Sequence, residues 1–142
     1  YAKELWLKEP STTSLNRLSK ESIERGDHFI SMNGREVFRH AVKRFPETIN
    51  EALEHNGLTT DDISLLIPHQ ANLRISDMIQ KKLGLPDSKV YNNIEKYGNT
   101  TAASIPICLS EAKVKGLIND NDLVVCAAFG AGFLWGSAII KW

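Results

Sequence analysis

The stretch that decides the fold is ISLLIPHQANLRI, which occupies residues 63–75. Residues 63–67 form a short apolar run that predicts a buried β-strand, and Pro68-His69-Gln70 ends it. Over about residues 71–83, apolar side chains recur every three or four positions, which predicts a helix that Gly84 ends. A buried strand followed by such a helix is typical of α/β proteins, whose functional residues often follow the carboxyl end of a strand.

Similar periodic segments extend along the chain. A strand is predicted at residues 28–32, and an apolar stripe over residues 38–53 predicts a helix. Pro46 lies inside that stripe and should kink the helix or split it after Phe45. The remaining elements are a weak strand at 89–91, a helix over 102–112 and a hairpin of strands 123–129 and 133–140. The order β-α-β-α-β-α-β-β predicts a mixed, mostly parallel five-stranded sheet with helices on both faces.

The helix over residues 102–112 has almost no polar face before Glu111. A helix that is apolar all round is buried all round, so a second layer of structure should cover it. The rest of the 142 residues offers no such layer, and the chain begins at Tyr1 rather than at a methionine. We therefore expect part of a longer protein, with residues 1–26 as an irregular polar lead-in and residues 27–142 as one domain.

The composition excludes several classes of partner. The 17 basic and 17 acidic side chains cancel, which gives no overall attraction to nucleic acid or to an anionic membrane. Cys108 and Cys126 lie in apolar runs without metal-ligand spacing, so we expect reduced, buried thiols and no metal site. The sequence has no recognisable signal peptide and no apolar run long enough to cross a bilayer. These features predict a cytoplasmic protein that binds neither nucleic acid nor membrane.

Three features could carry chemistry, and each also has a structural explanation. His69 follows a predicted strand, where α/β proteins place their sites, but on position alone a surface or capping histidine is the simpler explanation. Asn99 precedes an apolar helix, where an N-cap is the simplest explanation, although a freed amide could donate to a ligand. The link Gly130-Ala131-Gly132 could bring a backbone N–H to an oxyanion, but a tight hairpin is the simpler explanation of its small residues.

A basic surface is a fourth candidate. One predicted helix presents Arg35, Arg39 and Lys43 at intervals of four residues, and the next helix carries Arg74, Lys81 and Lys82. A solvated face is the usual explanation for such charges, and an acidic partner is the alternative.

Four stretches of the sequence, taken together, carry a resemblance to a known family. Residues 68–75, PHQANLRI, and residues 97–106, YGNTTAASIP, resemble the His motif and the Asn motif of β-ketoacyl-acyl-carrier-protein synthase III. Residues 129–136, FGAGFLWG, are similar to its C-terminal glycine loop, and residues 33–38, NGREVF, to the start of its first C-terminal helix. The resemblance runs from about residue 27 to the end. It implies one βαβαβαββ half of a thiolase-like fold, with the nucleophilic Cys in the absent N-terminal half and the helix over residues 102–112 between the two halves.

The resemblance implies the first condensation of fatty-acid synthesis. An acyl group from acyl-CoA, with acetyl-CoA as the expected donor, is loaded onto the Cys. Malonyl-acyl carrier protein then loses carbon dioxide, and the enolate attacks the acyl thioester. The family needs no cofactor beyond acyl-CoA and the phosphopantetheine of acyl carrier protein as substrates, and it is usually a homodimer. Without the Cys, this chain should be inactive by itself.

The same resemblance assigns roles to individual residues. His69 and Asn99 would donate hydrogen bonds to the enolate oxygen, and the backbone N–H of Ala131 would help to hold a second oxyanion beside Phe129. Many family members have glycine at the position of Ala131. The pantetheine tunnel would be lined by Gly34, Ala71 and Asn72. The acidic carrier protein would meet the cations of Arg39, Arg74, Lys81 and Lys82.

Two alternatives stay open. A relative with the same fold could use another acyl donor or acceptor, as in quinolone or polyketide priming, and the His and Asn motifs do not separate this case. A non-catalytic subunit could bind carrier protein or pair with a complete synthase. Retention of both His69 and Asn99 argues against that second alternative, because a binding role needs neither residue.

Overall fold

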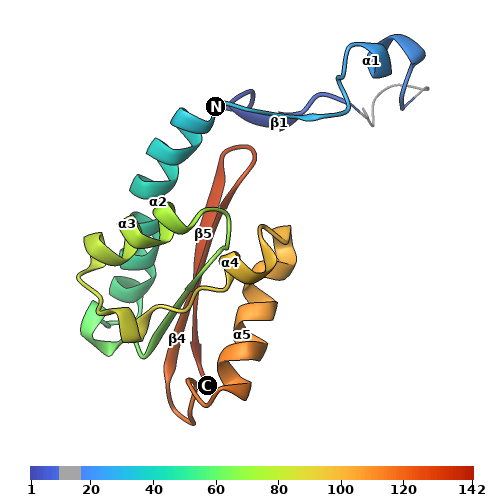
Figure 1. Ribbon diagram of the computed structural model, residues 1–142. Coiled ribbons are helices and arrows are strands. Elements are labelled where there is room, and N and C mark those ends of the chain that lie inside the picture. The colour runs from blue at the N-terminus through green and yellow to red at the C-terminus, as the bar shows by residue number, and fades with distance from the viewer. Residues whose placement is uncertain (10–16) are drawn as a thin grey trace. The chain divides into compact units, whose positions relative to one another are not determined.

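The computed structural model describes residues 1–9 and 17–142, and Figure 1 shows its helices and strands. The chain forms two compact units. The first comprises Tyr1–Arg39 and Gly130–Leu134, and the second comprises His40–Phe129 and Trp135–Trp142. Three elements contribute residues to both units: α2 (Gly34–His55), β4 (Leu123–Gly130) and β5 (Leu134–Lys141).

The second unit is built around a sheet with the strand order β3-β4-β5, in which β3 spans Leu65–Pro68. β3 pairs with β4 in parallel, and Leu65 lies opposite Val124. The link between β4 and β5 is too short for a crossover, so these neighbouring strands form the expected hairpin. A parallel pair needs a long crossover, and the helical segments between β3 and β4 supply it.

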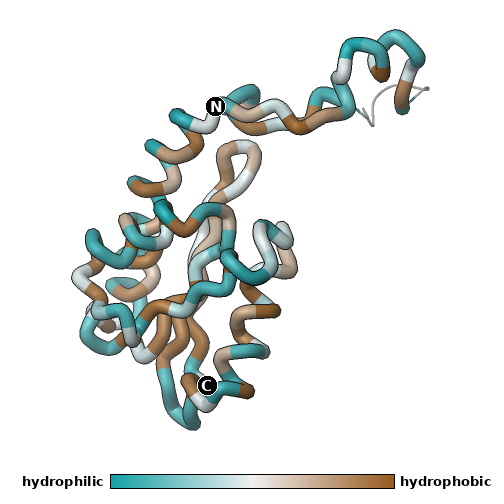
Figure 2. Tube along the Cα trace, viewed as in Figure 1, coloured by the Kyte–Doolittle hydropathy of each residue, from teal (hydrophilic) through white to brown (hydrophobic). Residues whose placement is uncertain are grey.

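Helices cover both faces of this sheet, as expected. One face packs against α5 (Ser104–Val114), and α2 and α3 (Leu73–Leu83) lie on the other side (Figure 1). The core beneath α5 contains the buried side chains of Leu65, Ile67, Cys108, Ala112, Val124 and Cys126. Because side chains alternate across a strand, Leu66 and Val125 point to the opposite face, where both are fully buried. Figure 2 accordingly shows brown along the lower part of the strands, and each fully buried aliphatic side chain contributes roughly 1.5–3 kcal/mol.

The expectation of one five-stranded sheet is wrong, because the structure has one sheet of three strands and one of two. The segment at 89–91 makes only an isolated bridge between Val90 and Leu66, since a 3-10 turn over Asp87–Lys89 leaves little extended chain there. The strand expected at 28–32 is β2 (Ile30–Met32), which pairs antiparallel with β1 (Leu5–Leu7) instead of joining the larger sheet. All three β2 residues are exposed, so this strand buries no side chain in a hydrophobic core.

Two further findings concern helices. Of the two outcomes expected at Pro46, the split after Phe45 does not occur, because α2 is a single helix through this residue. α5 is covered on its sheet side by the described residues: Cys108 and Ala112 face the sheet, whereas Pro106 is exposed and Val114 is 86% exposed, and the expected second layer is not among these residues. The helix also begins at Ser104, after a 3-10 turn over Thr101–Ala103. Among residues 1–9 and 17–142, none covers the outer face of α5 on which Pro106 and Val114 are exposed.

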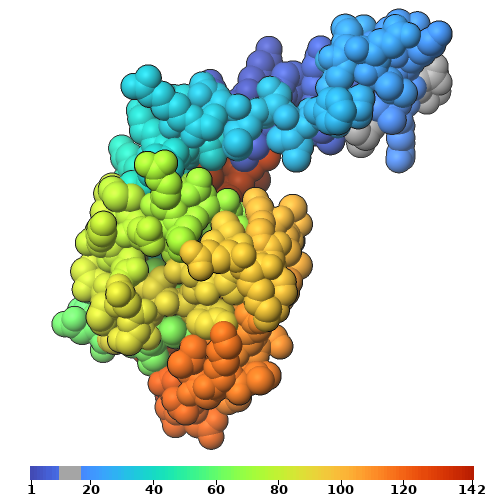
Figure 3. Space-filling model, in the orientation of Figure 1, coloured from blue at the N-terminus to red at the C-terminus, as the bar shows by residue number. Residues whose placement is uncertain are grey.

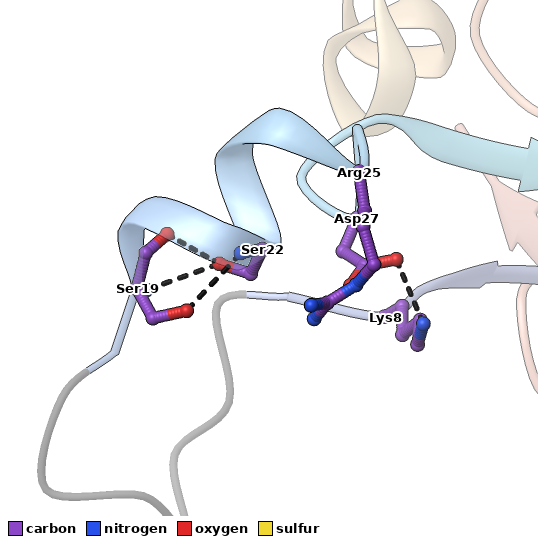
Figure 4. A network of polar contacts seen from close by, with 5 residues as sticks. All are labelled: Lys8, Ser19, Ser22, Arg25 and Asp27. Carbon is purple, nitrogen blue, oxygen red and sulfur yellow. Dashed lines mark hydrogen bonds and ion pairs between the residues drawn. The ribbon is translucent and has the colours of Figure 1, made fainter.

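The first unit contains two elements in the lead-in that was expected to be irregular. One is β1, and the other is α1 (Lys20–Glu24), which begins with a capping box between Ser19 and Ser22. Figure 4 shows this box and the neighbouring Asp27 carboxylate, which accepts hydrogen bonds from Lys8 at 2.7 Å and from Arg25 at 2.9 Å. Residues 10–16 of the expected lead-in lie outside the described residues. Among the described residues, no helix has the length and apolar character that a membrane span requires.

Candidate functional site

His69 lies where β3 ends. Its backbone N–H donates to the Ala127 carbonyl at 2.8 Å, which extends the parallel β3–β4 pairing by one residue. The chain then turns into α3, whose N-cap Asn72 accepts a hydrogen bond from the Arg74 N–H at 2.9 Å. The predicted strand–turn–helix is therefore present, and it holds the His69 side chain at the carboxyl end of a parallel strand, where open α/β sheets place their sites.

The imidazole of His69 is oriented by Ser104. The Nδ1 atom lies 2.6 Å from the Ser104 hydroxyl, and the ring is half-buried. Burial lowers the pKa of His69 below its ordinary value, which favours the neutral ring near neutral pH. A neutral imidazole carries one N–H donor, and within the described part of the chain Nε2 has no hydrogen-bond partner.

Asn99 is held by a short local hydrogen bond. Its Oδ1 accepts from the Thr101 N–H at 2.9 Å, the two-residue pattern of an Asx turn. The segment needs unusual backbone angles, with φ of 69° at Gly98 and 53° at Thr101. Asn99 does not occupy the cap position of α5, which is Ala103, so the N-cap explanation is replaced by the turn. The exposed amide keeps its Nδ2 donors for another partner.

The His and Asn motifs meet through α5. Ser104 is the first residue of that helix and follows Asn99 by five positions, and its hydroxyl contacts the His69 ring. The contact joins segments that are 35 residues apart in the chain. The segments of the two motifs are thereby linked at the carboxyl end of β3, and each of the two side chains keeps one polar atom without a partner among the described residues. This arrangement can bind an oxygen that carries or develops negative charge.

Gln70 forms hydrogen bonds at this end of the sheet that were not predicted from the sequence. The side chain is only 2% exposed, and its amide nitrogen donates to the Pro68 carbonyl at 2.8 Å and to Asn92 at 3.2 Å. Its amide oxygen accepts the backbone N–H groups of Asn93 and Ile94 at 2.9 and 3.1 Å. Gln70 therefore ties the loop of His69 to the segment that leads to Asn99.

A second polar cluster holds α4 (Ile94–Tyr97) against α5. The Glu111 carboxylate accepts hydrogen bonds from the side chains of Tyr91, Asn93, Lys96 and Tyr97. These hydrogen bonds hold the pKa of Glu111 at about 2, and the bond from Tyr97 contributes most to the lowering. A surface pocket of about 360 Å³ adjoins the cluster and is lined in part by Asn92, Lys96 and Lys115. No local pattern singles out Gln70 or Glu111, because the partners that give them their roles lie 14 to 24 residues away in the chain.

The other expected residues of the second unit fall into two groups. Phe129 is buried in β4, with its ring centroid 6.4 Å from that of Phe45 and 6.3 Å from that of Trp135. The remaining residues are exposed before or along α3: Ala71, Asn72, Arg74, Lys81 and Lys82. Figure 3 shows the surface that the segments around α3, α4 and α5 form in front of the strands of this unit.

Three expected residues belong to the first unit. Gly34 begins α2, Arg39 lies one turn further along it, and Ala131 lies in the link after β4. Arg39 donates two hydrogen bonds to the Glu36 carboxylate, so its guanidinium already has an anionic partner. In the link, Gly132 has φ of 135°, and an added Cβ would lie 2.9 Å from Leu134 Cγ, so this position requires glycine.

The two thiols have the character expected of structural cysteines. Both are free and buried, and burial raises the pKa of Cys108 and of Cys126 to about 11. A thiol with such a pKa is almost entirely protonated at neutral pH and is a poor nucleophile. Among residues 1–9 and 17–142, no three His, Cys, Asp or Glu side chains gather closely enough to hold a metal ion.

Comparisons with known proteins agree with these motifs. Residues 53–142 match the family described as 3-oxoacyl-[acyl-carrier-protein (ACP)] synthase III C terminal. A β-ketoacyl-[acyl-carrier-protein] synthase III of Symbiobacterium thermophilum is 49% identical over 124 residues, which cover 87% of this chain and 38% of the relative. The enzyme of the same name from Caldanaerobacter subterraneus is 50% identical over 133 residues, which cover 94% of this chain and 40% of the relative.

A solved structure extends the similarity to the fold. The β-ketoacyl-[acyl-carrier-protein] synthase III of Thermus thermophilus superposes with a TM-score of 0.83 at 42% identity. The superposition covers 99% of this chain and 42% of that protein. The chain thus spans about two fifths of the length of the relatives that it matches.

Proposed function

Because this chain belongs to the 3-oxoacyl-[acyl-carrier-protein] synthase III family, whose C-terminal domain it matches, we propose that it supplies two oxyanion donors to a condensing enzyme. The donors are His69 and Asn99. The reaction is the decarboxylative condensation of an acyl group, delivered as acyl-CoA, with malonyl-acyl carrier protein. The product is a β-ketoacyl-acyl carrier protein, the first elongated intermediate of fatty-acid synthesis.

One observation supports this proposal: in each of the two side chains one polar atom has a hydrogen-bond partner and the other has none among the described residues. The Nδ1 atom of His69 contacts Ser104, and the Oδ1 atom of Asn99 accepts from the Thr101 N–H. Neither contact uses Nε2 of the ring or Nδ2 of the amide. Two N–H donors without a nearby acceptor suit an oxygen that gains charge during a reaction, and each such donor is worth about 2.7–4 kcal/mol in other enzymes.

The proposed roles follow from where charge develops. When the malonyl thioester loses carbon dioxide, the electron pair of the broken C–C bond moves into an enolate whose oxygen is negative. His69 and Asn99 stabilise that oxygen. The enolate carbon then attacks the acyl thioester on the Cys, a new C–C bond forms, and the tetrahedral intermediate releases the Cys thiolate.

The second oxyanion forms during that attack, and we propose that the backbone N–H of Ala131 contributes to holding it. The requirement for glycine at position 132 supports a link of fixed shape, although Ala131 itself is exposed. Phe129 packs between Phe45 and Trp135, which gives a rigid apolar wall suited to an acyl chain.

The nucleophile must come from residues outside this chain. Cys108 and Cys126 are both buried, and the pKa of each thiol is raised to about 11. We therefore propose an N-terminal half that bears the reactive Cys and that covers the open apolar face of α5. The exposed Pro106 and Val114 and the half-buried Ile107 on that face support this arrangement. By analogy with the family, the assembled synthase would be a homodimer.

Substrate binding would use the surface beside His69. Ala71 and Asn72 are exposed immediately after it, and with Gly34 they would line the path of the pantetheine arm. Arg74, Lys81 and Lys82 form no ion pair with the described residues, which leaves their charges for an acidic carrier protein. Arg39 would have to exchange Glu36 for a carrier-protein carboxylate.

The test is complementation. This chain is assayed for condensation of acyl-CoA with malonyl-acyl carrier protein, alone and co-expressed with the Cys-bearing half of a close relative. We expect no product from the chain alone, product from the pair, and loss of product with His69→Ala or Asn99→Ala. The exposed residues His55 and Asn50 offer matched controls, and His55→Ala and Asn50→Ala should leave activity unchanged.

Either of two results would overturn the proposal. An assembled, folded pair without condensation activity would favour a carrier-protein-binding subunit. Activity from this chain alone would place a nucleophile within it.

A further inference from the structure

The hydroxyl of Ser104 lies at the junction between the two motifs. Ser104 is only 1% exposed, and its Oγ lies 2.6 Å from His69 Nδ1 and 3.3 Å from the backbone nitrogen of Gln70. The Gln70 N–H can only donate, so it uses one acceptor position of the hydroxyl. The hydroxyl also has a proton of its own, and a buried proton of this kind needs an acceptor.

Only one arrangement of protons satisfies all three groups. If His69 carried its proton on Nδ1, the hydroxyl would accept from both His69 and Gln70, and its own proton would have no acceptor among the described residues. If the proton is on Nε2, then Nδ1 presents a lone pair and the Ser104 hydroxyl donates to it. The 2.6 Å separation suits a donor and acceptor in direct contact.

We propose that Ser104 is a positioning residue that donates its hydroxyl proton to Nδ1 and so holds His69 with its proton on Nε2. The tautomer follows from this chain alone, and its catalytic consequence rests on the function proposed above. That function requires His69 to donate a hydrogen bond from Nε2, and the opposite tautomer would present a lone pair to the enolate oxygen. Ser104 would therefore act through His69 without touching the substrate.

The surroundings of Ser104 make the arrangement rigid. The residue begins α5, and the next helical turn places Cys108 in the sheet core, so the packing of the helix fixes the backbone from which the hydroxyl projects. Gln70 holds the other side of the contact, because its own side chain is fixed to the carbonyl of Pro68 and to the backbone of Asn93. Burial also lowers the pKa of His69, which keeps the ring neutral and preserves Nδ1 as an acceptor.

The experiment uses the assembled synthase with this chain labelled with ¹⁵N-histidine. The sequence has four histidines, and the signals of His69 are assigned by their loss in His69→Ala. Long-range proton–nitrogen correlation spectra distinguish the protonated from the unprotonated ring nitrogen. We expect the wild type to carry its proton on Nε2, and Ser104→Ala to show a mixture of tautomers.

The kinetic measurement is decarboxylation of malonyl-acyl carrier protein. Ser104→Ala should lower kcat by about tenfold, less than the ~10²–10³ expected when a donor is removed entirely, and leave KM unchanged. Ser104→Thr retains the hydroxyl and should restore both the tautomer and the rate. The control is Ser76→Ala. Ser76 is 4% exposed and its hydroxyl donates to Asn92, and its loss should change neither the tautomer of His69 nor kcat.

Several outcomes would overturn the inference. A wild-type spectrum with the proton on Nδ1 would do so without any variant, even if Ser104→Ala failed to fold. An unchanged tautomer in Ser104→Ala would also do so, as would an equal loss of kcat in Ser76→Ala. The spectra separate this inference from the proposed function: an assembled protein with the Nε2–H tautomer but no decarboxylation would contradict the function and leave the role of Ser104 standing.

Discussion

The hydroxyl of Tyr97 donates a hydrogen bond to the Glu111 carboxylate at 2.7 Å, and this contact fastens α4 to α5 two residues before Asn99. Lys96 adds an ion pair to the same oxygen at 2.9 Å, while Asn93 donates to the other oxygen at 2.9 Å. The proposed donor Asn99 is exposed and lies on a turn, so its position depends on these anchors. The carboxylate that organises them has no contact with His69 among the described residues.

This cluster predicts a stability that depends on pH. Hydrogen bonds, above all from Tyr97, hold the pKa of Glu111 at about 2 in the folded chain, against an ordinary value of 4.5. As the pH falls, the unfolded chain takes up the proton first. The stabilisation from Glu111 is therefore fully present above about pH 4.5 and is lost as the pH falls toward 2.

Urea unfolding of the assembled synthase, compared with that of Glu111→Gln, measures this contribution. The difference in midpoint should be large near neutral pH and should shrink through the acid range. Glu54→Gln, at an exposed site on α2, is the control and should show little difference at any pH. A gap between wild type and Glu111→Gln that stayed constant down to pH 2 would contradict the assigned pKa.

Replacement of Gln70 by alanine should cost stability. The change removes the partner of the Asn93 and Ile94 N–H groups and of the Pro68 carbonyl, and a buried group left unpaired costs about 1–3 kcal/mol. Allowing for relaxation, we expect the free energy of unfolding to fall by about 2–4 kcal/mol. Chemical denaturation followed by circular dichroism checks this value.

A matched glutamine lies on α3. Gln80 is partly exposed, and its amide donates to Asp87 and to the Leu85 carbonyl, so solvent can replace those bonds. Gln80→Ala should lose less than half of what Gln70→Ala loses. Equal losses at the two positions would show that Gln70 has no special structural role.

Asn99→Asp separates the two ends of the Asn99 side chain. An aspartate oxygen can still accept from the Thr101 N–H, so the turn should persist. The substitution removes both Nδ2 protons and adds a negative charge, so decarboxylation of malonyl-acyl carrier protein should slow by ~10²–10³ or more. Asn50→Asp, on the exposed face of α2, should have no such effect. A variant Asn99→Asp with normal kcat would exclude the amide as an oxyanion donor.

The cysteines of this chain should resist alkylation. Burial raises the pKa of Cys108 and of Cys126 to about 11, so the thiolate is scarce and inaccessible in the folded protein. Mass spectrometry after brief treatment with iodoacetamide should find both unmodified, and both modified when urea is present. Cys108→Ala should retain condensation activity. Rapid labelling of either cysteine in the folded protein would reopen the question of a nucleophile in this chain.

The elements with strong periodicity were predicted well. The apolar run at 63–67 became β3, the hairpin at 123–140 became β4 and β5, and the helix that Gly84 ends became α3. The local pattern is enough to predict such segments, because burial on one or both faces determines whether each position is apolar or polar. The predictions failed for segments whose structure depends on a distant pairing partner. β2 pairs with β1, which lies in a polar lead-in, and Val90 forms only an isolated bridge and no strand.

The sequence by itself determined the motifs around His69 and Asn99, the family and the alternation of strands and helices, because each depends on residues that are close in the chain. Only the tertiary structure brought Ser104 against His69 across 35 residues and joined Gln70 to the segment before Asn99. It also revealed which polar atoms of His69 and Asn99 have hydrogen-bond partners among the described residues and which have none. Such contacts depend on how α5 packs against the sheet, and no local pattern encodes the direction in which a hydroxyl or an amide then points.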